Sequence, residues 1–210
     1  MRTVVPRVLA ALPDAITAAV FLIAWIAPAI PGPEYIGNLM LTMLIEFIVM
    51  HSSAFYSGIA ADSADSPIKR TLWLIGLSVF YLGFVAAFAF AFDRTWPLFA
   101  FAWLFVSRFI HLWVRPTGGT AQSERMMAIW AASAFTYVIG AIATVVLPLP
   151  ALGITPDVIR SMHLPGSGEW IDRPYTVLAF GTLYFGVQAW VKYALSGSDA
   201  GKTASHKQAL

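Results

Sequence analysis

Six long apolar stretches constrain this chain more than any other feature of its sequence. Each approaches or exceeds the ~20 residues that a helix needs to cross about 30 Å of hydrocarbon. Backbone polar groups in hydrocarbon have to be satisfied internally, and these stretches lack the two-residue alternation of barrel strands. The sequence therefore predicts an all-α, polytopic integral membrane protein with six transmembrane helices. Their approximate bounds are 14–30, 37–61, 71–92, 95–114, 126–149 and 175–195.

The overall composition agrees with a chain that uses the lipid bilayer as part of its solvent. Hydrophobic residues make up 59% and charged residues 11% of the chain, against about 45–50% and about 25% in soluble domains. The formal net charge of +2 is too small to indicate binding to nucleic acid. The absence of cysteine from the sequence excludes disulfides, thiolate metal sites and cysteine nucleophiles.

Lysine and arginine are distributed unevenly between the two sides of the predicted helices. If the N-terminus is cytoplasmic, nine of them lie on the cytoplasmic side and three on the other, while Arg108 falls within a helix. Positive charge is enriched in cytoplasmic loops. We therefore expect a multi-pass protein of the bacterial inner membrane with both termini in the cytoplasm. The nine residues are Arg2, Arg7, Lys69, Arg70, Arg115, Arg125, Lys192, Lys202 and Lys207.

The six helices are expected to form one domain over residues 1–195. Residues 196–210 are mostly small and polar, which predicts a disordered cytoplasmic tail. Short links at 31–36 and 93–94 predict that the first and second helices, and the third and fourth, are antiparallel neighbours.

The stretch 150–174 is the longest connection outside the cytoplasm. Its residues Thr155 and Pro156 resemble a helix start, with threonine as the N-cap and proline at the first helical position. The stretch therefore contains either a short interfacial helix or a plain connector.

Ionisable residues inside the second and fourth predicted helices are the strongest indication of a functional site. They are Glu46 and His51 in the second helix, and Arg108 and His111 in the fourth. Such groups are costly at membrane depth, so they usually face a bundle interior, a cavity or each other. At 100° per residue Glu46 shares one polar stripe of its helix with other residues, whereas His51 lies about 140° around. The stripe consists of Asn38, Thr42, Glu46, Ser53 and Ser57.

Glu46 has two interpretations. It is either a proton- or cation-handling group in a polar path, or a structural group that pairs with Arg108 or bonds two helices together. Arg108 itself is either an interior partner or a side chain that reaches the interface. The leading hypothesis is a small transport or channel protein whose polar path comprises Glu46, Ser53, Ser57, His51 and Arg108.

Two further classes of protein stay open. In the first, the chain is a non-catalytic membrane subunit that binds partner helices, or a haem b between His51 and His111, because axial histidines come from facing helices at matching heights. In the second, it is an intramembrane enzyme, which the separation of Glu46 and His51 disfavours. No metal-binding motif such as HExxH occurs in the sequence. A homo-oligomer or a larger membrane complex is compatible with each class.

Overall fold

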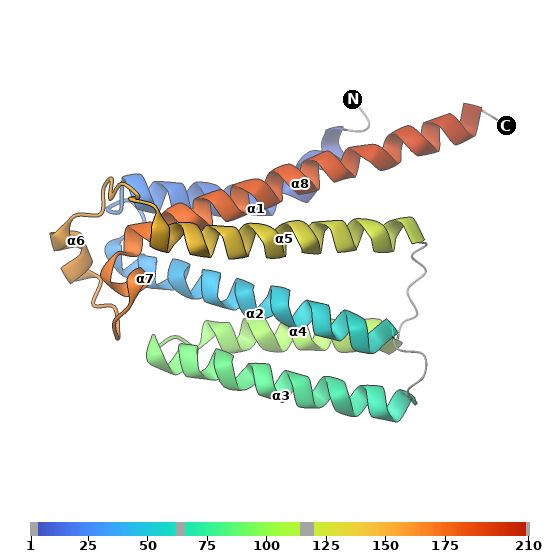
Figure 1. Cartoon of the computed structure of the whole chain (residues 1–210), viewed down its shortest axis with the longest axis horizontal. Coiled ribbons are helices and arrows are strands. Elements are labelled where there is room, and N and C mark those ends of the chain that lie inside the picture. Colours follow the sequence, from blue (N-terminus) through green and yellow to red (C-terminus); the bar gives the residue numbers. More distant parts are fainter. Residues whose placement is uncertain (1–3, 62–65, 114–119, 209–210) are drawn as a thin grey trace.

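The computed structural model describes residues 4–61, 66–113 and 120–208, and over these residues the chain forms helices and connecting turns. The body of the molecule is a bundle of long helices that run along one common direction (Figure 1). These are α1 (Val4–Ile26), α2 (Ile36–Ala61), α3 (Pro67–Ala91), α4 (Trp96–Trp113), α5 (Thr120–Val146) and α8 (Pro174–Gln208). Short helices η1 (Pro33–Tyr35), α6 (Pro156–Ser161) and α7 (Glu169–Asp172) lie in the connections at one end.

The all-α prediction is confirmed, and in the described residues four helices are long and apolar enough to cross a membrane. These helices are the first, second, third and fifth of the six predicted ones. The fourth and sixth correspond to α4 and α8, whose membrane-crossing role stays a prediction. The four candidate spans are Arg7–Ile26, Pro33–Tyr56, Thr71–Ala91 and Met127–Val146.

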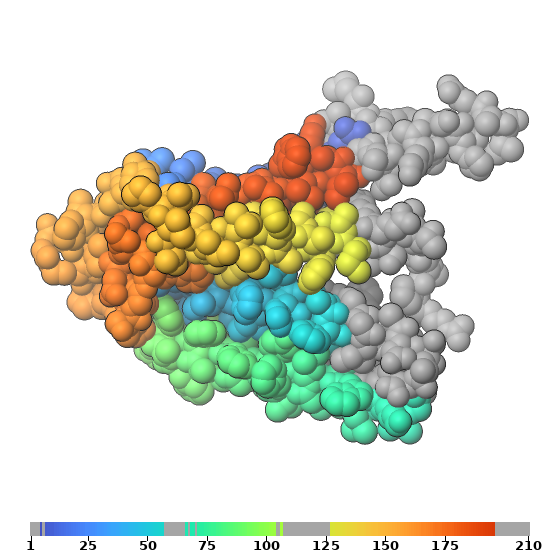
Figure 2. All heavy atoms as spheres, viewed as in Figure 1, coloured from blue at the N-terminus to red at the C-terminus, as the bar shows by residue number. Residues whose placement is uncertain are grey.

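The helices form two groups that share α2. In the first group α8 packs against α1, α5 and α2, and in the second α2 packs against α3 and α4. Each group has its own buried cluster, with Phe21, Met43 and Tyr184 in the first and Ile45 and Val85 in the second. On the face drawn in Figure 2, α2 is visible between α5 and α3. Residues on α2 therefore contact helices of both groups.

The closest pairing is between the first and last helices of the chain. Residues of α1 lie along α8 and approach α2 at few points among the described residues, so the expected pairing of the first two helices is wrong. The reason lies on α8: Gly181 has no side chain, and the buried ring of Phe21 occupies the space that a Cβ there would fill, its Cδ1 atom only 2.2 Å from that position. The expected pairing of α3 with α4 is confirmed.

Two helix boundaries differ from the sequence expectation. Helix α1 begins at Val4 rather than near residue 14, since Pro6 falls in the first turn, where no backbone N–H is needed. At the other end of the chain, α8 continues to Gln208 through the predicted tail. Alanine and lysine each occur twice in residues 196–208 and are strong helix formers.

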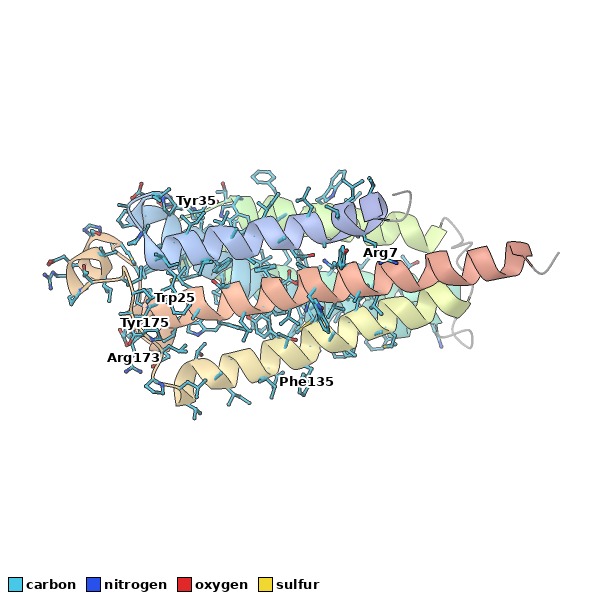
Figure 3. The ribbon with its side chains drawn as sticks, turned by 90° about the horizontal axis from the view of Figure 1, so that it is seen from above. Arg7, Trp25, Tyr35, Phe135, Arg173 and Tyr175 are labelled. Carbon is cyan, nitrogen blue, oxygen red and sulfur yellow. The ribbon has the colours of Figure 1, made fainter. Side chains whose placement is uncertain are left out.

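A small cap closes the end of the bundle opposite the first residues of α1. Of the two possibilities for residues 150–174, the structure has a short helix, α6, whose N-cap hydroxyl on Thr155 accepts a hydrogen bond from the Val158 N–H at 3.3 Å. Its position at the membrane interface stays a prediction. The indole of Trp25 donates to the Pro150 carbonyl at 3.0 Å, and Gly153 N–H donates to the Trp25 carbonyl at 3.1 Å. Figure 3 shows Trp25 at this end of the bundle. The cap thereby ties the connection to the end of α1.

Candidate functional site

The carboxylate of Glu46 reaches across the first helix group and contacts α8. Its Oε1 atom accepts a hydrogen bond from the hydroxyl of Tyr184 at 2.7 Å. Tyr184 is fully buried, while Glu46 is partly buried. This distance is typical of a well-formed O–H···O hydrogen bond. The structure therefore gives Glu46 a hydroxyl donor, from a helix that the sequence did not connect with it.

A second polar contact joins α5 to α8 one turn beyond Tyr184. The Ser133 hydroxyl lies 2.9 Å from the Gln188 side-chain carbonyl and 2.9 Å from the Ile129 backbone carbonyl, both of which accept from it. Since a serine hydroxyl carries one proton, it serves these acceptors in turn. The Ser133–Gln188 pair and the Tyr184–Glu46 pair thus lie one turn apart along α8.

Gln188 also carries an unsatisfied donor. Its side chain is buried, 2% exposed, and its Nε2 atom has no hydrogen-bond partner among the described residues. An amide turned end for end would donate from Nε2 to the Ser133 oxygen, leaving the carbonyl end to accept. In both orientations one polar end of a buried amide is available, which is rare in packed interiors.

An ion pair lies one helical turn beyond Gln188. Lys192 Nζ and Asp14 Oδ2 are 2.6 Å apart and join α8 to α1. The Asp14 side chain is 12% exposed and that of Lys192 is 33% exposed. Tyr184, Gln188 and Lys192 are spaced four residues apart, so they share one face of α8. Both charges act on Glu46 through space, Lys192 attracting and Asp14 repelling its negative charge.

Aromatic side chains hold the Glu46–Tyr184 contact in place. The ring of Tyr137 packs edge-on against Tyr184 with centroids 5.5 Å apart, and its hydroxyl donates to the Met43 carbonyl at 2.8 Å. This bond fixes α5 on α2 beside Glu46. Because these rings are buried, the Tyr184 hydroxyl has little freedom to leave the carboxylate.

Polar residues also continue along α2 from Glu46 towards the cap. Asn38 and Thr42 lie on the same stripe as Glu46, and all three are partly exposed. The Trp96 indole of α4 donates to the Asn38 side-chain carbonyl at 3.2 Å, while Thr42 donates to the Asn38 backbone carbonyl at 2.8 Å. This part of the stripe therefore contacts α4.

His51 has different neighbours from Glu46, as its helical position predicts. The imidazole is exposed and packs among aromatic rings, with centroid distances of 5.4 Å to Phe47, 5.2 Å to Phe55 and 6.2 Å to Tyr81. Glu46 and His51 do not form a dyad in this structure.

The remaining residues predicted from the sequence have no described contact with Glu46. Ser53 donates to the Val49 carbonyl of its own helix at 2.7 Å. The side chains of Ser57, Arg108 and His111 lie outside those that the structure describes, so the Glu46–Arg108 pair and the two-histidine haem site stay predictions. Within the described chain, acidic and histidine side chains form no group of three that could hold a metal ion.

Sequence reasoning missed Tyr184, Ser133 and the Asp14–Lys192 pair. The regular spacing of Tyr184, Gln188 and Lys192 was the available signal. Tyrosine and serine are common in apolar helices, however, so this spacing alone does not identify a partner for Glu46.

Comparison with protein-family models, with curated proteins and with solved structures gives no match to this chain.

Proposed function

We propose that this chain is a six-span transport protein of the bacterial inner membrane with both termini in the cytoplasm. It moves a proton, a small cation or a small solute along a polar path centred on Glu46. The observation that carries the proposal is the contact of the Glu46 carboxylate with the Tyr184 hydroxyl inside the helix bundle. A carboxylate in such a position is costly, and in membrane proteins such groups mark ion and substrate pathways.

Polar groups on both sides of Glu46 support a path rather than an isolated contact. Asn38 and Thr42 lie on the side of the cap, and Gln188 and Lys192 lie towards the opposite end. This revises the path expected from the sequence, since α8 supplies its inner half in place of His51. Ser53, Ser57 and Arg108 remain secondary residues of the proposed polar path.

The arrangement of the chain ends supports the six-span topology. The start of α1 and the end of α8 lie at the same end of the bundle (Figure 1), as an even number of crossings requires. With α4 and α8 added to the four candidate spans, the basic residues fall mainly on the side of the termini.

Flux through reconstituted protein tests this proposal. Purified full-length chain in proteoliposomes should show flux of protons, sodium, potassium or a small solute above that of empty vesicles. Glu46→Gln should abolish that flux, because the amide keeps the shape and the acceptor of the hydrogen bond but has no charge to bind a cation. Glu34→Gln, in the exposed turn before α2, is the matched control and should leave the flux unchanged. Equal flux in wild type and Glu46→Gln would contradict the proposal.

The exposed imidazole supports a second candidate function, that of a membrane subunit. His51 stands among aromatic rings of α2 and is exposed in the part of the chain that the structure describes. A partner helix or a haem ligated by His51 and His111 would cover it. A Soret absorption band in the purified protein that disappears in His51→Ala would favour haem binding. No Soret band in protein purified with haem supplied would exclude haem binding.

A further inference from the structure

Helices α3 and α4 form a hairpin whose main helix partners are each other and α2. Their connection is short, and the Arg94 N–H closes it by donating to the Ala89 carbonyl of α3 at 2.8 Å. Asp93 adopts a left-handed φ of 50° in this turn, a conformation that aspartate tolerates better than most residues. The helix pairing and the tight turn together make the hairpin one rigid unit.

Helix α2 is held to the other helix group by hydrogen bonds along its length. The Tyr137 hydroxyl of α5 donates to the Met43 carbonyl at 2.8 Å. The Trp130 indole donates to the Met50 carbonyl at 3.1 Å. On both helices these positions are seven residues apart, so α5 bonds α2 at two points about two turns apart, and the bond of Glu46 to α8 lies between them. Since hydrogen bonds fix distance and direction, α2 moves with α5 and α8, and the hairpin is the separate part.

The turn of the hairpin is anchored to the start of α2 and to the cap. The indole of Trp96, the first residue of α4, donates to the Asn38 side-chain carbonyl at 3.2 Å. A Cβ on Gly37 of α2 would lie 3.8 Å from Phe92 Cδ1 and 3.5 Å from Leu164 Cδ2. Phe92 follows the end of α3 and Leu164 lies between α6 and α7, and both pack against the buried cluster of the first group. The hairpin, α2 and the cap thus meet at one point.

Farther from the cap, an apolar cluster joins the hairpin to α2. Apolar attraction is non-directional, so helices packed in this way can shift against each other where hydrogen-bonded helices cannot. The buried members of the cluster are Ile45 and Ile48 of α2, Tyr81 and Val85 of α3, and Phe101 of α4.

The two parts of the molecule diverge towards the end opposite the cap. In the view of Figure 1, α3 and α8 lie closest near the cap and separate towards the end where the chain termini lie. Towards this end the buried hydroxyls of Tyr56 on α2 and Ser78 on α3 bond at 2.6 Å. One neutral hydrogen bond of this kind adds little net stability. This contact can therefore break and re-form while the cap end stays packed.

We propose that the α3–α4 hairpin pivots on its turn at the cap, so that its opposite end swings towards and away from α2. The contacts at Asn38 and Gly37 form the pivot, and the Tyr56–Ser78 bond is the latch that holds the hairpin closed. This is a rigid-body hinge motion. Ser53 of the polar stripe lies one turn before Tyr56, so an outward swing opens that part of the stripe to water. The motion rests on the packing and does not depend on the proposed transport function.

Distances between pairs of spin labels test the pivot. Because the sequence contains no cysteine, paired cysteine substitutions at exposed positions of the full-length protein can be labelled selectively. Double electron–electron resonance in lipid nanodiscs then measures each distance distribution. Trp73→Cys with Met127→Cys is the swinging-end pair on α3 and α5, and Phe90→Cys with Val146→Cys is the cap-end pair on the same helices. The swinging-end pair should show two distances and the cap-end pair one.

Removing the latch and removing a pivot contact should act on different pairs. Tyr56→Phe should raise the ratio of the longer to the shorter swinging-end distance about 2–10-fold, since it deletes one hydrogen bond of the closed state. It should leave the cap-end distance unchanged. Tyr193→Phe, an exposed tyrosine of α8, is the matched control and should change neither pair. Asn38→Ala removes the acceptor of Trp96 and should broaden the cap-end distance.

Each part of the proposal has an outcome that would overturn it. One narrow swinging-end distance in both wild type and Tyr56→Phe would overturn the swing. An unchanged cap-end distance in Asn38→Ala would overturn that contact as part of the pivot. Labels at Trp73 and Trp103, both within the hairpin, should keep one narrow distance in every variant, which also establishes that the hairpin is folded; a second distance would overturn the rigid unit.

Reaction of a cysteine on the polar stripe tests the consequence of the swing. Ser53→Cys should react with a charged thiol reagent about 2–10-fold faster when Tyr56→Phe is also present, because the population of the open hairpin rises by that factor. Addition of Tyr193→Phe should leave the rate unchanged. Equal rates with and without Tyr56→Phe would overturn the opening of the stripe. Both measurements are made without any flux, so their failure is distinguishable from failure of the transport function.

Discussion

The packing of α1 on α8 can be tested with two glycines of the same helix. Gly181 and Gly186 are five residues apart on α8, and only the first meets a neighbour. A Cβ on Gly181 would lie 2.2 Å, 2.3 Å and 2.7 Å from the Cδ1, Cε1 and Cγ atoms of Phe21. A Cβ on Gly186 would meet nothing within 4 Å.

The expected magnitude follows from the geometry around Phe21. Non-bonded carbons prefer about 3.5–4.0 Å, so the ring would have to withdraw by more than about 1 Å. Phe21 is fully buried and its ring packs on Phe185 at 5.6 Å, which leaves it no free direction. Overpacking of this kind costs about 1–3 kcal/mol. Both substitutions gain the same helix propensity, about 1 kcal/mol, so the difference between Gly181→Ala and Gly186→Ala measures the clash alone.

Unfolding of the purified protein provides the assay. Titration of micelle-solubilised protein with sodium dodecyl sulfate, followed by circular dichroism, gives a free energy of unfolding for each variant. Gly181→Ala should be less stable than Gly186→Ala by about 1–3 kcal/mol. Equal stability of the two variants would refute the close approach of α1 and α8. The double variant Gly181→Ala/Phe21→Leu should recover part of the loss, because the smaller side chain vacates the space.

Two further substitutions test contacts away from Glu46. Tyr56→Phe should lower the free energy of unfolding by about 1 kcal/mol, since it removes the buried 2.6 Å bond between Tyr56 of α2 and Ser78 of α3; Tyr35→Phe in the exposed turn is its control, and no difference between them would argue against that bond. Thr155→Ala should cost about 1 kcal/mol through loss of the α6 N-cap, seen as faster hydrogen exchange at Val158, whereas Thr155→Ser should keep the protection; fast exchange already in wild type would contradict the cap.

The sequence was sufficient to predict the helices because each apolar stretch is long and bounded by polar or turn-forming residues. It also placed Glu46 and His51 on different faces, since that depends only on the 100° helical period. The N-cap at Thr155 was predictable for a similar reason, because capping involves neighbours three residues apart.

The sequence was insufficient where the answer depends on which helices touch. Short links suggested that α1 lies on α2, but the matching surfaces are Phe21 of α1 and Gly181 of α8, far apart in the chain. Likewise, Glu46 had a charged candidate partner in Arg108, whereas the hydrogen bond that the structure describes comes from Tyr184. The spacing of residues in a sequence does not reveal which helix surfaces have complementary shapes or where a hydroxyl points. Packing of this kind therefore has to be read from the three-dimensional structure.

The ion pair of Asp14 and Lys192 joins positions 178 residues apart, which bears on how the protein is made. During synthesis α1 is made before α8, so Asp14 exists before its cationic partner. Until α8 is made, the Asp14 carboxylate of α1 lacks its lysine partner, and a lipid environment accommodates an unpaired carboxylate poorly. Arrival of α8 supplies the lysine, the glycine surface for Phe21 and the hydroxyl for Glu46 together. Completion of the described bundle is thus tied to α8, and a chain cut short before α8 should be recognised and degraded by proteases.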